Sequence, residues 1–140
     1  MKIVIIIYKI NNHSIGVSNI TKSISNISSS VVGINVTQIK KENIQSYWNP
    51  FYQYFKTYEV DNLGSGLIFS SDGYIITNAH VISDAKNIVV TLLGGQRYNA
   101  KLIGIDNLTD VALIKIDGKN LPYAILGDSD KLAVGEWTIA

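Results

Sequence analysis

From residue 64 onward, short apolar runs alternate with turns that contain glycine or aspartate, and this pattern constrains the fold more than any other feature. The runs are GLIFS, YIITN, NIVVTLL, RYNAKLIGI, VALIKI, YAIL and EWTIA. Asp72-Gly73 separates the first two and supplies the positive φ that a hairpin turn needs. No helical pattern lies between the runs, so a parallel α/β sheet is excluded. The pattern predicts an all-β fold, an antiparallel barrel or sandwich.

The segment before residue 64 is less regular. Ile20, Ile24 and Ile27 have helical spacing and predict a short N-terminal helix. SVVGINV, from Ser30 to Val36, is typical of a strand.

An aromatic stretch follows, YWNPFYQYFKTY at residues 47–58. Its central proline, Pro50, argues against a regular central strand. We therefore expect an aromatic loop over about 45–60, with rings that pack either on their own domain or on a partner.

Composition excludes several classes of protein. Hydrophobic residues make up 46% and charged residues 16%, which argues against a disordered chain. The net charge is +1 and the lysines are scattered, so no nucleic-acid partner is indicated. The chain has no cysteine, which excludes disulfides, thiolate catalysis and cysteine-ligated zinc.

The N-terminus MKIVIIIYKI has an apolar run from Ile3 to Tyr8. This run is too short to span a bilayer, which takes about 20 residues. It is also shorter than the usual core of a signal peptide, about 7–15 residues. A clipped export signal, a short strand and an unstructured end remain as interpretations.

His80 follows the apolar run of GYIITNAHVI and is one of two histidines. Such a residue can be a hydrogen-bonded part of the core, a metal ligand or a proton carrier. The metal interpretation lacks ligands, because His13 lies in the polar N-terminal segment and no carboxylate cluster surrounds His80. Proton transfer requires a carboxylate that holds the imidazole.

Asp110 in LTDVALIKI is the best candidate for that carboxylate. It stands directly before a strongly apolar run, where a carboxylate needs a donor or a cation nearby. Asp110 could instead close the DNLTD turn by accepting backbone N–H groups, and without His80 that role is the favoured one.

The ordered motifs LGSGLIFSSDGYIITNAHVI, TDVALIKID and NLPYAILGDSDKLAVGEWTIA resemble the HtrA (DegP/DegQ/DegS) family of trypsin-like serine proteases. ISSSVVGINVTQI also resembles the first protease strand of that family, so the resemblance covers roughly residues 20–140. It implies that His80 is the general base and that Asp110 orients it. The implied fold is the first of two trypsin-like β-barrels, with the second barrel absent from this chain.

The serine of the family lies in a GNSGG motif, which this sequence does not contain. Gly127-Asp128-Ser129 is similar to the GDSGG of trypsin-like enzymes, but Asp130 and Lys131 replace the glycines that let the backbone approach the substrate. Ser129 is therefore not expected to be the nucleophile, and the 140 residues alone are expected to be inactive.

Three neighbouring features fit the same interpretation. Ala79 is small enough for an aspartate and an imidazole to pack over it, and Thr77 could lend a hydroxyl to the pair. Gly64-Ser65-Gly66 is expected to be a turn at the entry to a strand, because no P-loop lysine and helix follow it.

The resemblance also implies the organisation and setting of the protein. Residues 1–19 would be an N-terminal segment, as a remnant of an export signal, and residues 20–140 a partial protease domain. The implied substrates are unfolded or misfolded proteins and peptides in the periplasm or cell envelope, with no cofactor. The full-length protein would be a homotrimer, with room for a membrane tether upstream, and the aromatic loop would mediate trimer contacts or shield a neighbouring active site.

Two alternatives belong to other classes of protein. One is a non-catalytic β-barrel that binds proteins in the manner of a chaperone, a pseudoprotease in which His80 and Asp110 are relics. The other is an unrelated β-rich structural protein. In the protease interpretation, the face that would pack on the second barrel is expected to be apolar and to promote self-association.

Overall fold

The computed structural model describes residues 21, 24–25, 27–45, 53–131 and 134, and most of these residues lie in strands. These residues form β1 Val31–Gln45, β2 Gln53–Ile68, β3 Tyr74–Thr77, β4 Ala85–Thr91, β5 Arg97–Asp106 and β6 Val111–Ile116. A helical turn, α2 (Ala79–Ile82), lies between β3 and β4, and a 3-10 turn, η1 (Ser129–Lys131), follows β6. The described residues among 21–28 are helical, as the isoleucine spacing predicts.

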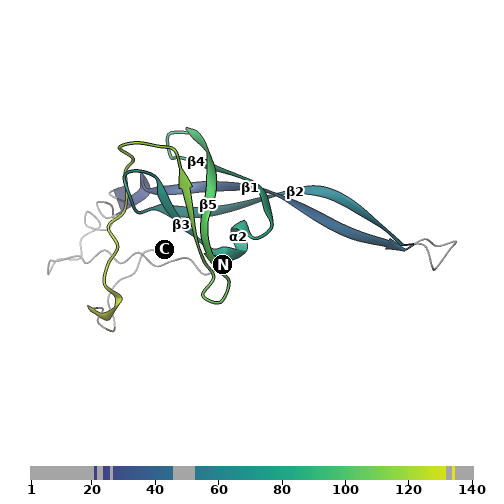
Figure 1. Ribbon diagram of the computed structural model, residues 1–140. Helices are drawn as coiled ribbons and strands as arrows, with labels where there is room; N and C mark the ends of the chain where they lie inside the picture. The colour runs from purple at the N-terminus through teal and green to yellow at the C-terminus, as the bar shows by residue number, and fades with distance from the viewer. Residues whose placement is uncertain (1–20, 22–23, 26, 46–52, 132–133, 135–140) are drawn as a thin grey trace.

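The strands close into a barrel in the order β1-β2-β3-β6-β5-β4, and every neighbouring pair is antiparallel. The predicted all-β barrel is therefore confirmed. Figure 1 shows that the far parts of β1 and β2 leave the barrel together as a long two-stranded ribbon. Among the described residues, no helix combines the length and the apolar character that crossing a membrane requires.

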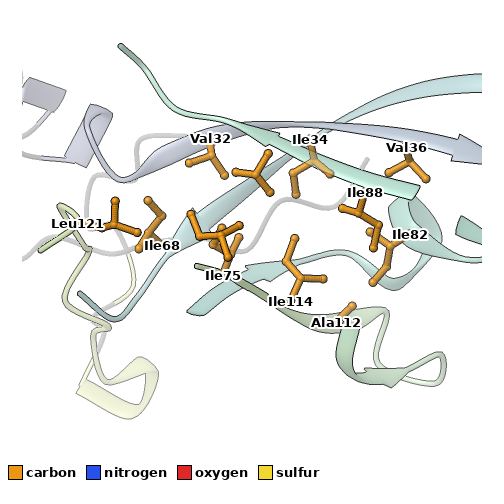
Figure 2. Packing of buried hydrophobic residues seen from close by; sticks show 12 residues of the cluster. Val32, Ile34, Val36, Ile68, Ile75, Ile82, Ile88, Ala112, Ile114 and Leu121 are labelled. Carbon is orange, nitrogen blue, oxygen red and sulfur yellow. The ribbon is translucent and has the colours of Figure 1, made fainter. Parts of the chain in front are cut away.

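Branched aliphatic side chains fill the barrel. Along β1, Val32, Ile34 and Val36 point inward and are at most 2% exposed. Val31, the first residue of the strand, is 42% exposed. This alternation follows from the two-residue repeat of a strand. Figure 2 shows how labelled residues from β1, β2, β3, β4, β6 and α2 meet in one interior.

The hairpin between β2 and β3 turns at Gly73, as predicted from Asp72-Gly73. Gly73 has a φ of 99°, a conformation that side chains rarely adopt, and its N–H donates to the carbonyl of Ser70 at 3.0 Å. A Cβ at this position would lie 2.5 Å from the carbonyl oxygen of Ile116. Glycine is thus required both by the turn and by the close passage of β6.

The aromatic stretch differs from the expected loop wherever it is described. Residues 53–60 belong to β2 and pair in continuous register with Gln38–Gln45 of β1. The aromatic and β-branched residues that precede Asp61 favour a strand, and they form one although Pro50 argued against it. Pro50 itself lies outside the described residues, as do positions 1–19.

The run YAIL does not form the strand that its composition suggested. The described strands already close into a barrel without this run, and Pro122 lacks an N–H to donate to a neighbouring strand. This segment instead crosses the end of the β2–β3 hairpin, where Ala124 donates to the carbonyl of Ile68 at 2.8 Å. The run EWTIA falls outside the described residues.

Candidate active site

The turn α2 directly follows β3 and directs His80 outward. Two of its residues are anchored in the interior, Ala79 at 1% and Ile82 at 2% exposure. Ser83 ends the turn, and both its N–H and its hydroxyl donate to the carbonyl of Ala79, at 2.9 and 2.8 Å. Because the neighbours of His80 are fixed, its imidazole is held at the surface, where its side chain is 54% exposed.

Gly64 allows α2 to sit this close to β2. A Cβ on Gly64 would collide with the side chain of Val81, the residue after His80. Gly64-Ser65-Gly66 is accordingly not the turn that we expected, since all three residues lie inside β2 and pair with Val32–Ile34 of β1. The glycines serve close packing in the strand interior.

Strand pairing brings Asp110 to the same place. β3 and β6 are neighbours, with Thr77 opposite Ala112. His80 lies in α2, just after the end of β3, and Asp110 directly precedes the first residue of β6. Residues that are 30 positions apart in the sequence therefore meet at one end of the sheet.

Asp106 closes the turn between β5 and β6. Its carboxylate accepts the N–H of Leu108 at 2.9 Å and the hydroxyl of Thr109 at 2.7 Å. The hydroxyl of Thr109 and then the N–H of Leu108 hold the pKa of Asp106 below its ordinary value. The turn-closing role that we had considered for Asp110 thus belongs to Asp106, and the carboxylate of Asp110 faces α2.

The contact between Asp110 and His80 is extensive. Nδ1 of His80 lies 2.8 Å from Oδ2 and 3.0 Å from Oδ1 of Asp110. The backbone N–H of His80 also donates to Oδ1 at 2.9 Å. Asp110 has a left-handed φ of 57°, and its own carbonyl accepts the N–H of Ala79 at 3.3 Å.

These bonds set the protonation of the pair. The pKa of Asp110 is held below its ordinary value, chiefly by the backbone N–H of His80, then by the imidazole and its charge, with a smaller contribution from Asn78. Burial opposes this lowering. An ionised carboxylate can only accept hydrogen bonds, so the proton of a neutral imidazole lies on Nδ1 and Nε2 is left as a base.

The other residues singled out in the sequence have separate roles. Thr77 is buried, and its hydroxyl donates to the carbonyl of Ser65 at 2.8 Å, which ties β3 to β2. Ala79 is buried as a packing residue would be. Ser129 lies exposed in η1.

Asn78 is a site residue that sequence reasoning missed. Its amide donates to the carbonyl oxygen of Asp110 at 3.1 Å and to Oδ2 of the same residue at 3.2 Å. The available signal was its position, since an asparagine directly before a helical turn is typical of an N-cap.

Metal ligation finds no support in the part of the chain that the structure describes. Within those residues, no group of three or more histidine, aspartate or glutamate side chains could hold a metal ion. His13 lies outside them.

The chain is similar to known proteins in sequence and in fold. Residues 64–140 match the family described as trypsin-like peptidase domain. A protein of Pseudomonas putida named "Probable periplasmic serine endoprotease DegP-like" is 58% identical over 82 residues, which is 59% of this chain and 17% of that protein. A protein of the same name from Chlamydia muridarum is 56% identical over 77 residues, 55% of this chain and 16% of that protein. The chain therefore spans about a sixth of the length of these relatives.

Solved structures of the HtrA-type protease AlgW are also similar. The structure with a tripeptide is 33% identical, with a TM-score of 0.65 over 82% of this chain and 32% of that one. The structure with a decapeptide is 33% identical, with a TM-score of 0.63 over 82% of this chain and 38% of that one. The barrel, the sequence match and these structures together identify the chain as a member of the trypsin-like peptidase family, of the HtrA (DegP-like) type.

Proposed function

We propose that this chain supplies the general base and the orienting carboxylate of a serine endopeptidase. The contact of Nδ1 of His80 with Oδ2 of Asp110, at 2.8 Å, is the observation that carries the proposal. Nε2 of His80 would take the proton of a serine hydroxyl as the serine attacks a peptide carbonyl, and would then pass it to the leaving amine. Asp110 would keep the proton on Nδ1 and stabilise the imidazolium.

The relatives support a substrate class and a location. DegP-like proteins are named periplasmic endoproteases, and AlgW is named with bound peptides. We therefore propose unfolded proteins and peptides as substrates and the periplasm as the compartment. Residues 20–140 would belong to the protease domain and residues 1–19 to an export segment, in a protein that assembles as a homotrimer.

The 140-residue polypeptide on its own should not hydrolyse peptide bonds, because it contains no GNSGG sequence to supply the nucleophile. The test is release of labelled peptides from unfolded casein by the purified chain. Turnover that disappears in His80→Ala would contradict this expectation.

A chimera tests the roles of the pair. Residues 1–140 are joined to the remaining part of the AlgW protease domain, which carries the serine, and casein hydrolysis is measured. His80→Ala should abolish the activity, and Asp110→Asn should lower kcat by about 10⁴-fold, because an uncharged amide neither fixes the proton on Nδ1 nor stabilises the imidazolium.

Asp117→Asn is the matched control, a change of the same chemistry at an exposed residue after β6. It should leave kcat unchanged. An active chimera that tolerates Asp110→Asn as well as it tolerates Asp117→Asn would refute the proposed roles.

A further inference from the structure

Asn78 occupies the N-cap of α2, yet its side chain makes no capping bond to that helix. An asparagine at an N-cap usually accepts the N–H of the second or third helical residue. Here the second N–H, that of His80, goes to the carboxylate of Asp110 at 2.9 Å. The residue that caps α2 is thus Asp110, which directly precedes the neighbouring strand β6, and the Asn78 side chain is free of that role.

The amide of Asn78 bridges the backbone and the side chain of Asp110. Its nitrogen lies 3.1 Å from the carbonyl oxygen and 3.2 Å from Oδ2. Both partners are acceptors, so only the NH₂ group of the amide fits against them and its oxygen must point away.

The carboxylate needs such a restraint. The side chain of Asp110 is 36% exposed, so water competes for its oxygens, and rotation about its side-chain bonds would carry Oδ2 away from the imidazole. The backbone N–H of His80 donates to Oδ1. Among the described residues, only the imidazole of His80 and the amide of Asn78 form side-chain hydrogen bonds with Oδ2. Because the amide of Asn78 also donates to the backbone carbonyl of Asp110, it fixes the Asp110 carboxylate relative to the Asp110 main chain.

We infer that Asn78 is a positioning residue for the proposed catalytic pair, whose amide keeps the Asp110 carboxylate against Nδ1 of His80. This inference rests on the proposed function, but it concerns the pair itself and can be tested without a nucleophile. The bond from Asn78 also contributes to the lowered pKa of Asp110.

Two substitutions separate a donor role from a capping role. Asn78→Ala removes both the donor and any capacity to cap. Asn78→Asp keeps the shape and an excellent cap, but places a second carboxylate against Oδ2. A capping role predicts that Asp behaves like the native residue, whereas a donor role predicts that Asp is the more harmful change.

The first measurement is NMR on the 140-residue chain with labelled histidine, at a pH high enough to leave the imidazole neutral. With two histidines in the sequence, a His80→Gln sample assigns the signals. The native chain should hold the proton of His80 on Nδ1. Both substitutions should shift His80 toward the other tautomer, Asp more than Ala.

The second measurement is the titration of the Asp110 carboxyl carbon. The pKa should rise from the native chain to Asn78→Ala and further to Asn78→Asp, because a donor is lost and then a like charge is added. Asn87→Asp, an exposed change in β4, is the matched control and should alter neither readout.

Backbone amide spectra verify that each variant is folded, and if Asn78→Ala unfolds, the isosteric Asp variant decides alone. An Asp variant with a native tautomer and a native Asp110 titration would overturn the inference. In the chimera, Asn78→Ala should lower kcat by about 10-fold, the scale of one charged hydrogen bond. If Asp110→Asn leaves the chimera active, the proposed function fails, while the NMR result on Asn78 still stands or falls by itself.

Discussion

Two aspartates four positions apart, at the turn of the β5–β6 hairpin, have different hydrogen-bond partners. Asp106 closes the turn through Leu108 and Thr109, and Asp110 serves α2 and the imidazole. The pKa of each is lowered by hydrogen bonds that favour its ionised form. Folding therefore stabilises both carboxylates as anions.

This lowering predicts how stability depends on pH. A carboxylate whose pKa is lower in the folded state adds stability that is complete above the ordinary value of 3.8 and is lost as the pH falls through the lower folded value. Asp110→Asn should thus be less stable than the native chain at neutral pH, and the difference should shrink below pH 3.8. Urea unfolding across this range checks it. A difference that does not change with pH would contradict the prediction, and Asp117→Asn serves as the control.

Gly64 gives a second prediction for a single residue. Gly64→Ala forces a Cβ into Val81 and should cost about 1–3 kcal/mol of unfolding free energy, the usual range for overpacking. Gly94→Ala is its control, since a Cβ there meets nothing within 4 Å and φ is not left-handed. Denaturant unfolding of both variants is the measurement, and equal stabilities would show that α2 can move aside without cost.

Among the elements, β1 and β2 are unusual because each has a part inside the barrel and a part outside it. β1 pairs with β4 only over Gly33–Gln38, and β2 pairs with β3 only over Gly66–Ile68. Beyond these parts the two strands pair only with each other, and Ile39, Phe55 and Tyr58 are exposed at 42% or more. The outer ribbon of Figure 1 thus contributes little to the core of the barrel.

Shortening the ribbon should therefore leave the barrel intact. Lys41 and Thr57 are directly opposite, so residues 42–56 can be replaced by an Asn-Gly turn that closes the hairpin in register. The ion pair of Lys86 with Glu59, at 2.6 Å, is retained. Thermal unfolding should shift by only a few degrees, as expected for a change of about 1 kcal/mol or less, and the His80 tautomer should stay native. Loss of cooperative unfolding would show that the ribbon stabilises the barrel.

At the level of the whole molecule, large apolar side chains are exposed on β5, in the turn that follows it and at the start of β6. Leu102, Ile103 and Ile105 on β5 are 42–53% exposed, Leu108 in the following turn is 94% exposed, and Val111 is 38% exposed. A register shift between Leu102 and Gly104 interrupts the alternation of β5 at this point. Exposed apolar area of this kind promotes association.

The isolated chain should accordingly self-associate in a concentration-dependent manner, and Ile103→Lys with Leu108→Lys should reduce the association. Sedimentation velocity over a concentration series is the measurement. Leu63→Lys, a similarly exposed position on β2, is the control. A native chain that remains monomeric at high concentration would contradict the prediction.

The amino-acid sequence by itself determined the class of fold, and it predicted that His80 and Asp110 act as a pair. Alternating apolar residues and the Asp72-Gly73 turn are local signals, and they predicted the strands and the hairpin because side-chain alternation and positive φ act within a few residues. His80 and Asp110 were identified from the motifs around them.

The tertiary structure alone decided the hydrogen-bond partners of Asp110 and Asn78. That choice depends on the pairing of β3 with β6, which brings residues 30 positions apart into contact and is not encoded in any short window. Through this pairing the carboxylate of Asp110 meets His80, and the amide of Asn78 donates to Asp110 instead of capping α2. The tertiary structure also gave residues 53–60 of the predicted loop a partner in β1, and the hydrogen bonds of that pairing add to the strand preference of their own side chains.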